Sequence, residues 1–430
     1  MNYDDIVSFI KSLKFLTEKE KYSWCHEKKD FLFGNKVIFS TISSKHFKMV
    51  KFIGIPIFRT LKKMLFVDPE NLTFDPVNPI AIFDMAPYIR KFGVKVDVCR
   101  YPNLPKRKDY DIVGLSCVTG YGGSVYEQLK KLREFYPNSE IVLGGKWTHI
   151  LTPEEENTVT SLGVCIEKAP AEFCYTESDE IDYENYPAWD KKDFEKLNEN
   201  DFIMSARGCP FKCHFCNNTE SHLSFFSAKR MAKIIKMVLE KYNTVRFMDD
   251  IFALNLKHPM AILEECKKQH IPIVGKSIFN FHIKSDLKLL TQLVEMYKPV
   301  RIEVGIESGD NRILANMNKK ITVDDIREKI KTLSKYVSIS GLWLIGFPGE
   351  TEESLENSYQ LLAELKPYMS HNYISHYIPL NHTVGYDLAK QEGGTFLTAV
   401  NSKCVSYIPP TLTEEILKKY YKKMRNLNNF

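Results

Sequence analysis

The sequence predicts an α/β protein in which a doubly wound (Rossmann-like) parallel sheet is followed by a second, longer array of strand–helix units. In both halves of the chain, short apolar runs alternate with amphipathic stretches of helical length, a pattern typical of parallel sheets. The chain has 430 residues, which is too many for one ordinary domain. Its 44% hydrophobic and 26% charged residues are typical of a globular protein.

The N-terminal half is expected to hold a short extension and the doubly wound domain. Apolar residues at helical spacing predict a helical extension over residues 1–35. The doubly wound domain is assigned to residues 36–180, with strands predicted over 36–42, 94–99, 111–117 and 140–143, and helices over 80–92 and 124–136. Sheets of this kind bind ligands beyond the carboxyl ends of their strands. These ends carry the candidate ligand-binding residues Ser116, Thr119, Gly144 and Gly145.

The second half is expected to contain six strand–helix units over residues 201–385, after a linker at 181–200. Strands are predicted over 202–205, 244–248, 271–275, 300–304, 338–345 and 373–378. Helices are predicted over 228–241, 259–269, 285–297, 322–335 and 351–366. Six units are too few for a closed eight-fold barrel. A C-terminal helical segment is assigned to residues 386–430.

Three cysteines in C-x3-C-x2-C spacing, Cys209, Cys213 and Cys216, follow the first of these strands. A glycine and a proline at this point interrupt regular structure, so the strand leads into a loop that carries three thiols. Soft thiolates at this density select zinc or an iron–sulfur cluster. A structural zinc takes four ligands, and His214 is the further candidate inside the loop. Three cysteines on a four-iron cluster would leave one iron open.

The cysteine loop, with aromatic Phe215 before its last cysteine, resembles the cluster loop of radical S-adenosylmethionine (radical SAM) enzymes. The resemblance implies a partial (β/α)6 barrel in which the three cysteines hold a 4Fe–4S cluster and Phe215 packs beside the cluster and the adenine. S-adenosylmethionine (SAM) would bind the open iron through its amino and carboxylate groups. Its reductive cleavage would give methionine and a 5′-deoxyadenosyl radical, which removes a hydrogen atom from an unactivated carbon.

The strand predicted over 244–248 ends in paired carboxylates, Asp249 and Asp250. Carboxylates at the end of an apolar strand require cations or hydrogen-bond donors. The stretch resembles the family's second-strand motif, which implies that one of the two contacts the amino group of SAM. The alternative is the capped start of a helix.

Two later strand ends also resemble SAM-binding segments of the family. Glu303, Glu307 and Ser308 lie in a stretch similar to a fourth-strand motif, which implies contacts to the amino group or the ribose of SAM. Glu303 and Glu307 are four positions apart along the strand, so they are expected on one face of it. Ile345 lies in a segment similar to the fifth-strand end, where backbone groups would contact the adenine.

The doubly wound domain resembles the cobalamin-binding domain that precedes the radical domain in one radical SAM class. The resemblance rests on the order of its strands and helices and on the glycine pair after residue 143. It implies a corrin held by backbone contacts at Ser116–Thr119 and Gly144–Gly145. The Asp-x-His-x-x-Gly motif that supplies a lower cobalt ligand is absent, so base-off cobalamin is expected.

Two features bear on whether cobalamin binds at all. His46 is a candidate substitute for the missing cobalt ligand. Lys146 and Trp147 are bulkier than the residues usual after the glycine pair, and they would narrow the path of the nucleotide tail. The alternative is a domain that keeps the fold without the cofactor.

Taken together, these resemblances predict a cobalamin-dependent C-methyltransferase. Without cobalamin, the prediction becomes a radical SAM epimerase, cyclase or rearrangement enzyme, with Cys404 as the hydrogen-atom donor. The other interpretation of Cys404 is a buried small hydrophobe. A methylthiotransferase is disfavoured, because Cys99, Cys117, Cys165 and Cys174 do not form a clear N-terminal cysteine triad.

Composition restricts the partners and the compartment. The net charge of +5 is mild and the basic residues are spread along the chain, which argues against a nucleic-acid partner. No apolar run has the length of a membrane span, and no signal peptide is evident. Ten cysteines without a secretory signal indicate a reducing compartment, the cytoplasm. The expected partners are a small-molecule or peptide substrate and an electron donor such as flavodoxin or ferredoxin.

Overall fold

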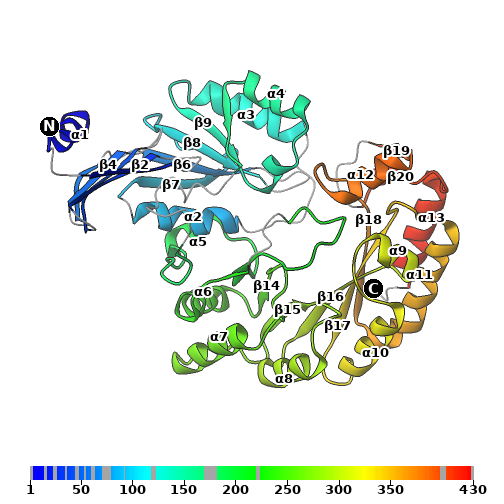
Figure 1. Ribbon diagram of the computed structural model, residues 1–430. Coiled ribbons are helices and arrows are strands. Elements are labelled where there is room, and N and C mark those ends of the chain that lie inside the picture. Colours follow the sequence, from blue (N-terminus) through cyan, green and yellow to red (C-terminus); the bar gives the residue numbers. More distant parts are fainter. Residues whose placement is uncertain are drawn as a thin grey trace. The chain divides into compact units, whose positions relative to one another are not determined.

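The computed structural model of the chain contains two compact units, and Figure 1 shows the order of their helices and strands. Unit 1 comprises Met1–Glu70, Ala81–Asp182 and Trp189–Leu197. Unit 2 comprises Asn71–Ile80, Tyr183–Ala188 and Asn198–Phe430. The structure describes residues 3–13, 17–22, 27–33, 36–43, 48–52, 55–59, 63–69, 79–91, 93–117, 123–168, 182–218, 223–397 and 403–427.

Unit 1 begins with a helix and an antiparallel sheet. The five strands after α1 (Tyr3–Ser12) pair in the order β1-β2-β3-β4-β5. Their bounds are β1 Thr17–Tyr22, β2 Glu27–Phe33, β3 Lys36–Ser43, β4 Lys48–Phe52 and β5 Ile55–Arg59.

This sheet corrects two predictions. The helical extension expected over 1–35 ends at Ser12, and the strand expected over 36–42 belongs to the antiparallel sheet instead of the doubly wound domain. The physical reason is the pairing of β1 with β2 and of β2 with β3, which satisfies the backbone through non-local hydrogen bonds. Local apolar spacing carries no information on such pairing.

The doubly wound sheet begins at β6 (Lys63–Asp68), in a region for which the sequence predicts no element. Its strands lie in the order β10-β9-β8-β6-β7 and are parallel throughout. β6 lies between two neighbours and is buried over most of its length, which explains its apolar run. The other strands are β7 Lys95–Arg100, β8 Ile112–Ser116, β9 Glu140–Gly144 and β10 Val164–Ile166.

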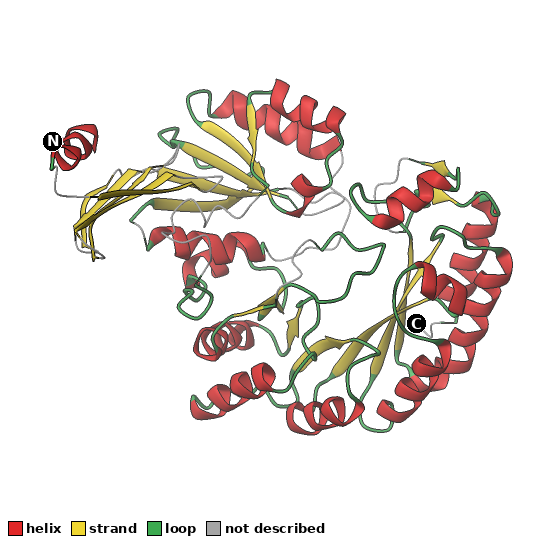
Figure 2. Ribbon diagram, in the orientation of Figure 1, coloured by secondary structure: helices red, strands yellow, loops and turns green. Residues whose placement is uncertain are grey.

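Helices cover both faces of the doubly wound sheet, as Figure 2 shows. They are α2 Ile80–Arg90, α3 Gly123–Phe135, α4 Pro153–Ser161 and α5 Lys191–Leu197. Trp189 donates from Nε1 to Asp84 Oδ1 at 2.8 Å, and Arg90 pairs with Asp193 at 2.6 Å. These contacts fasten residues 189–197, which the sequence assigned to a linker, to α2 of unit 1.

Unit 2 is built on a six-stranded parallel sheet whose strands follow chain order, β11-β14-β15-β16-β17-β18. This is the predicted (β/α)6 arrangement. The strands are β11 Phe202–Ile203, β14 Val245–Phe247, β15 Ser277–Phe281, β16 Arg301–Glu307, β17 Ile339–Ile345 and β18 His371–His376. The helices between them are α6 Ala228–Lys241, α7 Lys257–Lys268, α8 Leu287–Tyr297, α9 Asn311–Asn316, α10 Val323–Leu333 and α11 Glu352–Leu365.

The predicted strand at 271–275 is wrong, because the third strand of this sheet is β15. Gly275 has a φ of 81°, in the left-handed region that glycine adopts without steric cost, and it belongs to the turn before the strand. Ile271 and Ile273 in this segment are buried but not hydrogen-bonded into the sheet, and Val274 is exposed. Burial alone therefore does not distinguish this turn from a strand.

Successive side chains of β16 point to opposite faces of the sheet, which leaves one face of this strand polar. Ile302, Val304 and Ile306 are fully buried. Arg301, Glu303, Gly305 and Glu307 are partly exposed. Since successive side chains of a strand point to opposite faces, the charged residues share one face of the sheet.

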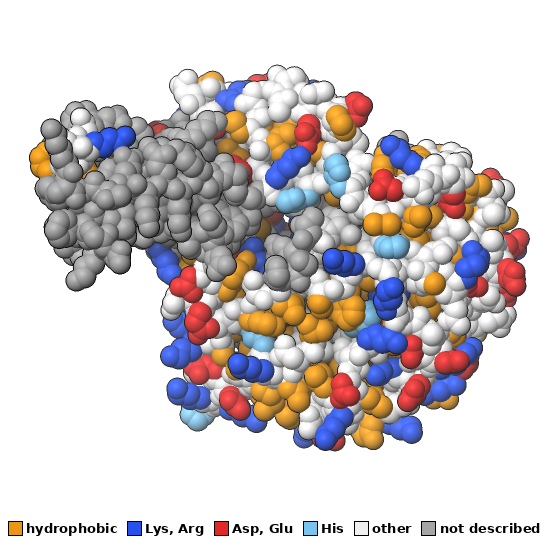
Figure 3. All heavy atoms as spheres, viewed as in Figure 1, with side chains coloured by type: hydrophobic (Ala, Val, Ile, Leu, Met, Phe, Trp, Pro, Cys, Tyr) orange, Lys and Arg blue, Asp and Glu red, His pale blue; other side chains and the backbone are white. Residues whose placement is uncertain are grey.

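The C-terminal segment contains α12 (Val384–Gln391), the strand pair β19 (Thr395–Phe396) and β20 (Tyr407–Ile408), and α13 (Glu414–Arg425). α13 packs along α11, where Lys423 and Tyr420 both contact Glu356. Within the described ranges, no helix is both long and apolar enough to cross a membrane. On the face of unit 2 seen in Figure 3, basic and acidic side chains are interspersed.

Candidate active site at the cysteine loop

The cysteine loop follows β11 and the short strand β12 (Ala206–Arg207), which pairs with β13 (Ser224–Phe225), and it carries three thiols between residues 209 and 216. Gly208 has a φ of 92°, so the chain turns at a residue without a side chain. Cys209 and Cys213 are partly buried, and Cys216 is exposed. Burial, with smaller contributions from Glu307 and from the thiols of Cys216 and Cys209, raises the pKa of Cys213 to about 11 against the lowering effect of Lys319.

Backbone contacts fix the loop against two other segments of unit 2. The N–H of His214 donates to the carbonyl oxygen of Met317 at 2.9 Å, and its own carbonyl accepts from the N–H of Gly385 at 2.7 Å. Asn318 donates from Nδ2 to the carbonyl oxygen of Lys212 at 2.7 Å. A side chain at Gly385 would meet the carbonyl oxygen of His214 at 2.8 Å, so this close approach requires glycine. The loop that carries the thiols is therefore held in place by hydrogen bonds to two other segments of unit 2.

The donor set fits a three-cysteine iron–sulfur cluster better than a four-ligand zinc site. His214, the further zinc candidate in the loop, has its Nδ1 within 2.7 Å of the carbonyl oxygen of Asn316. Among the residues that the structure describes, no three His, Cys, Asp or Glu side chains converge on one metal-ion position, so the cluster assignment rests on the identity and spacing of the three cysteines. Three soft thiolates without a fourth protein ligand suit a cluster with one open iron.

The two carboxylates after β14 differ in their surroundings. Asp249 is 2% exposed and accepts from the N–H of Ser205 at 2.5 Å and from the N–H of Ala206 at 3.2 Å. Burial raises its pKa to about 7, against the lowering effect of these hydrogen bonds. Asp250 accepts from Asn218 Nδ2 at 2.8 Å, and its charge adds to the effect of burial in raising the pKa of Cys209. Asp249 thus fixes the backbone just before the loop through hydrogen bonds, whereas Asp250 is hydrogen-bonded to Asn218, just after the last cysteine of the loop.

Glu303 and Glu307, predicted to share one face, do so but meet different partners. Glu303 Oε1 lies 3.1 Å from Arg301 and 3.8 Å from Arg246. Two guanidinium groups therefore already compensate the charge of Glu303 within the sheet.

Glu307 lies at the end of β16, beside the cysteine loop. Its Oε1 accepts from Lys319 Nζ at 2.9 Å, and both side chains are nearly buried. Burial alone would lower the pKa of Lys319, but Glu307 and Cys213 more than offset it, so the pKa lies above its usual value. A side chain at Gly305 would meet Glu307 Oε1 at 2.2 Å and Lys319 Nζ at 2.9 Å. The missing side chain of Gly305 thus makes room for the ion pair.

Two other predicted SAM contacts serve as internal supports in the structure. Ser308 is fully buried, its Oγ lies 3.2 Å from Ser358 Oγ, and it accepts from the N–H of Asp310 at 3.1 Å. Ile345 is fully buried, and its carbonyl oxygen accepts from the N–H of Tyr377 at 2.8 Å. The side chains of both residues belong to the packing around the strand ends.

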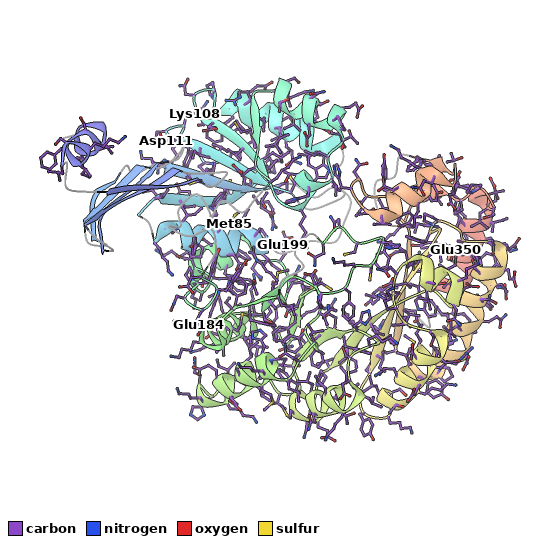
Figure 4. All side chains as sticks on the ribbon, viewed as in Figure 1. Met85, Lys108, Asp111, Glu184, Glu199 and Glu350 are labelled. Carbon is purple, nitrogen blue, oxygen red and sulfur yellow. The ribbon has the colours of Figure 1, made fainter. Side chains whose placement is uncertain are left out.

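Glu350 closes the turn that follows β17 and is labelled in Figure 4. It is fully buried, and its Oε2 accepts from the N–H of Gly346. Burial raises the pKa of Glu350 to about 8, although the N–H groups of Gly346 and Phe347 act in the opposite direction. Glu350 therefore shapes the segment that was predicted to contact the adenine.

Phe215 and Cys404 lie in different surroundings. Phe215 is partly buried against the apolar cluster that contains Phe347 and Tyr377, and Lys319 Nζ lies 5.6 Å from the centre of its ring. Cys404 is partly buried in the segment that leads into β20. Its role as a hydrogen-atom donor stays a prediction.

At the carboxyl edge of the doubly wound sheet, Ser116 pairs with Gly144 across β8 and β9. Gly145 has a φ of 94°, and a side chain there would meet the carbonyl oxygen of Cys117 at 2.2 Å. Among the described residues, a side chain at Gly144 would meet only the carbonyl oxygen of Glu167, at 3.8 Å. Gly145 is thus required by the fold itself, whereas Gly144 leaves free space at the edge.

The two residues predicted to narrow this edge lie in different surroundings. Trp147 is 4% exposed and packs edge-on against Tyr126, with ring centres 5.8 Å apart, so its side chain points into the domain core. Lys146 is exposed. Thr119 and His46 lie outside the described residues.

Two residues of the site, Lys319 and His282, were not predicted from the sequence. Lys319 follows a helix that carries no recognised motif, and His282 follows β15 as a single histidine. The Met317-Asn318-Lys319-Lys320 run after the fourth-strand motif was a usable signal for Lys319, because a cation is needed to compensate a strand-end carboxylate. His282 gave no signal, because its importance depends on stacking with Phe211 from a distant segment.

Comparison with known proteins agrees with this geometry. Residues 203–362 match the Radical SAM superfamily. An uncharacterized methyltransferase of Pyrococcus horikoshii is 28% identical over 172 residues, which are 38% of this chain and 36% of that protein. A probable threonylcarbamoyladenosine tRNA methylthiotransferase of Archaeoglobus fulgidus is 27% identical over 188 residues, 40% of this chain and 44% of that protein. The chain thus spans less than half the length of both relatives.

A solved structure resembles the chain over a greater length. The radical SAM methyltransferase TsrM of Kitasatospora setae, with cobalamin and a 4Fe–4S cluster bound, superposes with a TM-score of 0.66 at 14% identity. The match covers 86% of this chain and 89% of that chain. At this identity the likeness establishes the fold. Residues 203–362 therefore form a domain of the Radical SAM superfamily, and the chain has the fold of the cobalamin-bound methyltransferase TsrM.

Proposed function

We propose that the protein is a radical SAM enzyme that cleaves SAM reductively and methylates an unactivated carbon of its substrate with the help of cobalamin. The observation that carries the proposal is the cysteine loop, which is braced at the end of a six-stranded parallel sheet beside the acidic strand ends. Carboxyl ends of parallel strands are where such folds place their active sites. The match to the Radical SAM superfamily covers this loop and these strand ends.

A 4Fe–4S cluster at this loop would supply the electron that cleaves SAM. Cys209, Cys213 and Cys216 would hold the cluster, and the hydrogen bonds of Asp249 would keep the entry to the loop in place. Glu307 and Lys319 would present a carboxylate and an ammonium group to the zwitterionic methionyl part of SAM. Burial around these groups excludes water, which strengthens their electrostatic interactions.

The doubly wound domain supports the methyltransferase form of the proposal. Among the described residues, the edge at Ser116 and Gly144 has room for a ligand near the backbone, and the side chain of Trp147 is buried in the core. Cobalamin would lie base-off at this edge and would supply the methyl group. Binding would depend on backbone contacts and corrin burial, as expected for a site without the Asp-x-His-x-x-Gly motif.

The described N-terminal cysteines do not favour methylthio transfer, although one relative is a probable methylthiotransferase. Cys99 and Cys117 are 1% and 0% exposed within the apolar core of the doubly wound domain. Burial raises the pKa of both thiols well above the usual range. Thiols in this setting behave as small hydrophobes.

For the complete reaction, we further infer a small-molecule or peptide substrate, a flavodoxin or ferredoxin as electron donor, and a cytoplasmic location. These follow from the chemistry, which requires a reductant and a reducing environment, and from the number of cysteines.

Anaerobic reconstitution with iron, sulfide and hydroxocobalamin, followed by gel filtration and ultraviolet–visible spectroscopy, tests the proposal. The expected result is one four-iron cluster and one cobalamin per chain, with 5′-deoxyadenosine formed from SAM on reduction. Retention of the cluster without cobalamin would overturn the proposed methyltransferase activity and would favour an epimerase, cyclase or rearrangement enzyme. A protein without a four-iron cluster would overturn the whole proposal.

A further inference from the structure

His282 follows β15 and is covered by the cysteine loop. Its ring stacks on Phe211, with ring centres 3.9 Å apart and an angle of 12° between the planes. Phe211 lies in the loop between Cys209 and Cys213. The side chain of His282 is therefore held beside the loop, and the residue is 6% exposed.

The hydrogen bonds of His282 fix which ring nitrogen carries the proton. The N–H of Lys284 donates to Nδ1 at 3.1 Å, so Nδ1 is the unprotonated nitrogen. Burial, together with the charges of Lys319 and Lys284, lowers the pKa of His282 to about 3, so the ring is neutral. The proton of the neutral ring is consequently on Nε2.

This Nε2–H group is buried and has no hydrogen-bond acceptor among the described residues. A buried donor without a partner is destabilising, and native structures rarely keep one without a reason. A ligand that accepts this hydrogen bond would remove the penalty.

The groups around His282 indicate which ligand would do so. Phe281 pairs with Val304, so His282 lies near the level of Gly305, where the Glu307–Lys319 ion pair occupies the strand face. The ammonium group of Lys319 acts electrostatically on both His282 and Cys213. A neutral N–H donor and a buried cation together favour a carboxylate oxygen.

We propose that His282, through Nε2–H and together with Lys319, binds the α-carboxylate of SAM beside the cysteine loop. The inference rests on the proposed function, because it takes SAM as the ligand that meets the cluster loop. The carboxylate would accept from His282 and Lys319, and Glu307 would face the α-amino group. The three side chains would then complement both charges of the methionyl zwitterion.

Two substitutions at His282 separate the hydrogen bond from the packing. His282→Phe keeps a flat ring for the stack on Phe211 and removes the donor, whereas His282→Gln retains an N–H group near the position of Nε2. His376→Phe is a matched control: His376 is 3% exposed, stacks on Tyr421 at 4.7 Å, and has a buried Nδ1 without a partner. Its ring contacts α13 instead of the cysteine loop.

Equilibrium dialysis of the anaerobically reconstituted proteins measures the affinity for SAM and for decarboxylated SAM, which lacks the α-carboxylate. His282→Phe is expected to weaken SAM binding by roughly ten-fold to a hundred-fold, the effect of a lost charge-assisted hydrogen bond. Its affinity for decarboxylated SAM should be unchanged. His282→Gln should recover most of the SAM affinity, and His376→Phe should bind both ligands like the unmodified protein.

The outcomes distinguish this inference from the function on which it rests. If the unmodified protein holds its cluster and binds SAM, equal SAM affinity in His282→Phe overturns the role of His282 and leaves the proposed function intact. An equal loss of affinity for both ligands would also overturn it, because the effect would not involve the carboxylate. If the unmodified protein holds a cluster but binds no SAM, the proposed function fails first.

Discussion

Lys319 donates from Nζ to Glu307 Oε1 at 2.9 Å, and this ion pair lies over Gly305 on the polar face of β16. The lysine follows α9, and the glutamate ends the strand before it. A buried pair of this kind is costly to break, because the remaining charge is left without compensation. The position of the pair beside Cys213 makes it the charged centre of the proposed SAM site.

The first prediction separates the structural from the binding role of this pair. Glu307→Gln alone should lower the free energy of unfolding by about 3–5 kcal/mol, because Lys319 keeps its charge in a buried site. Adding Lys319→Met removes that charge, so the double variant should recover much of the lost stability. Its SAM affinity should nevertheless stay at least ten-fold below that of the unmodified protein. Urea unfolding and equilibrium dialysis measure the two quantities; a double variant with normal SAM affinity would show that the pair is structural only.

The second prediction concerns cobalamin at the edge of the doubly wound sheet. Gly144→Leu adds a side chain where the structure leaves space, so the protein should fold normally and lose hydroxocobalamin binding. Gly145→Ala should instead destabilise the domain, because its added carbon would meet the carbonyl oxygen of Cys117 at 2.2 Å. Gel filtration with cobalamin and thermal unfolding distinguish these effects. Normal cobalamin retention in a folded Gly144→Leu variant would contradict binding at this edge.

The third prediction assigns different roles to the two carboxylates after β14. Asp249→Ala leaves buried N–H groups of Ser205 and Ala206 without acceptors, which should cost about 1–3 kcal/mol for each group in the free energy of unfolding. Asp250→Ala should have a small effect on stability, because Asp250 is partly exposed. Chemical unfolding of both variants tests this ordering. Equal destabilisation would show that Asp250 is also part of the structural support.

The fourth prediction is a pH effect at Glu350. Its pKa is about 8 in the folded protein and 4.5 in a model peptide, so between these values the folded state holds a proton that the unfolded state has lost. This contribution to stability is present below about pH 4.5 and is lost as the pH rises towards 8. Glu350→Gln mimics the protonated carboxyl group and removes this dependence.

The variant should therefore gain stability relative to the unmodified protein between pH 6 and pH 8, by at most about 1.4 kcal/mol per pH unit. Urea unfolding at several pH values measures the difference. A stability difference that stays constant over this range would mean that Glu350 is ionised in the folded protein.

Much of the α/β fold was predictable because parallel strands and their helices carry strong local patterns. β8, β9 and β16, with α3 and α6, lie within a few residues of their predicted positions. The antiparallel sheet from β1 to β5 was not predicted, since its first strand, Thr17–Tyr22, is mostly charged and shows no apolar alternation. β6 was missed as well, although it is central to its sheet.

The site was predictable where a motif encodes chemistry and not where function depends on tertiary contact. The C-x3-C-x2-C spacing alone marks the three cysteines as candidate cluster ligands. Strand alternation placed Glu303 and Glu307 on one face. Alternation could not show that Glu303 meets arginines while Glu307 meets Lys319. His282 gains its significance only from the stack on Phe211 and the unpaired Nε2–H.

Cys209, Cys213 and Cys216 are proposed to hold a 4Fe–4S cluster that cleaves SAM. The most direct measurement is the iron and sulfide content, with the electron paramagnetic resonance spectrum of the reduced protein, for the unmodified chain and a variant with all three cysteines replaced by Ala. Replacement of Cys99, Cys117 and Cys165 by Ala is the matched control, because two of these are core thiols and all three lie outside the loop. We expect four irons, a reduced-cluster signal and 5′-deoxyadenosine from the unmodified chain and from a folded control variant. The variant without the three loop cysteines should show none of these. A full four-iron complement in that variant would contradict the proposal.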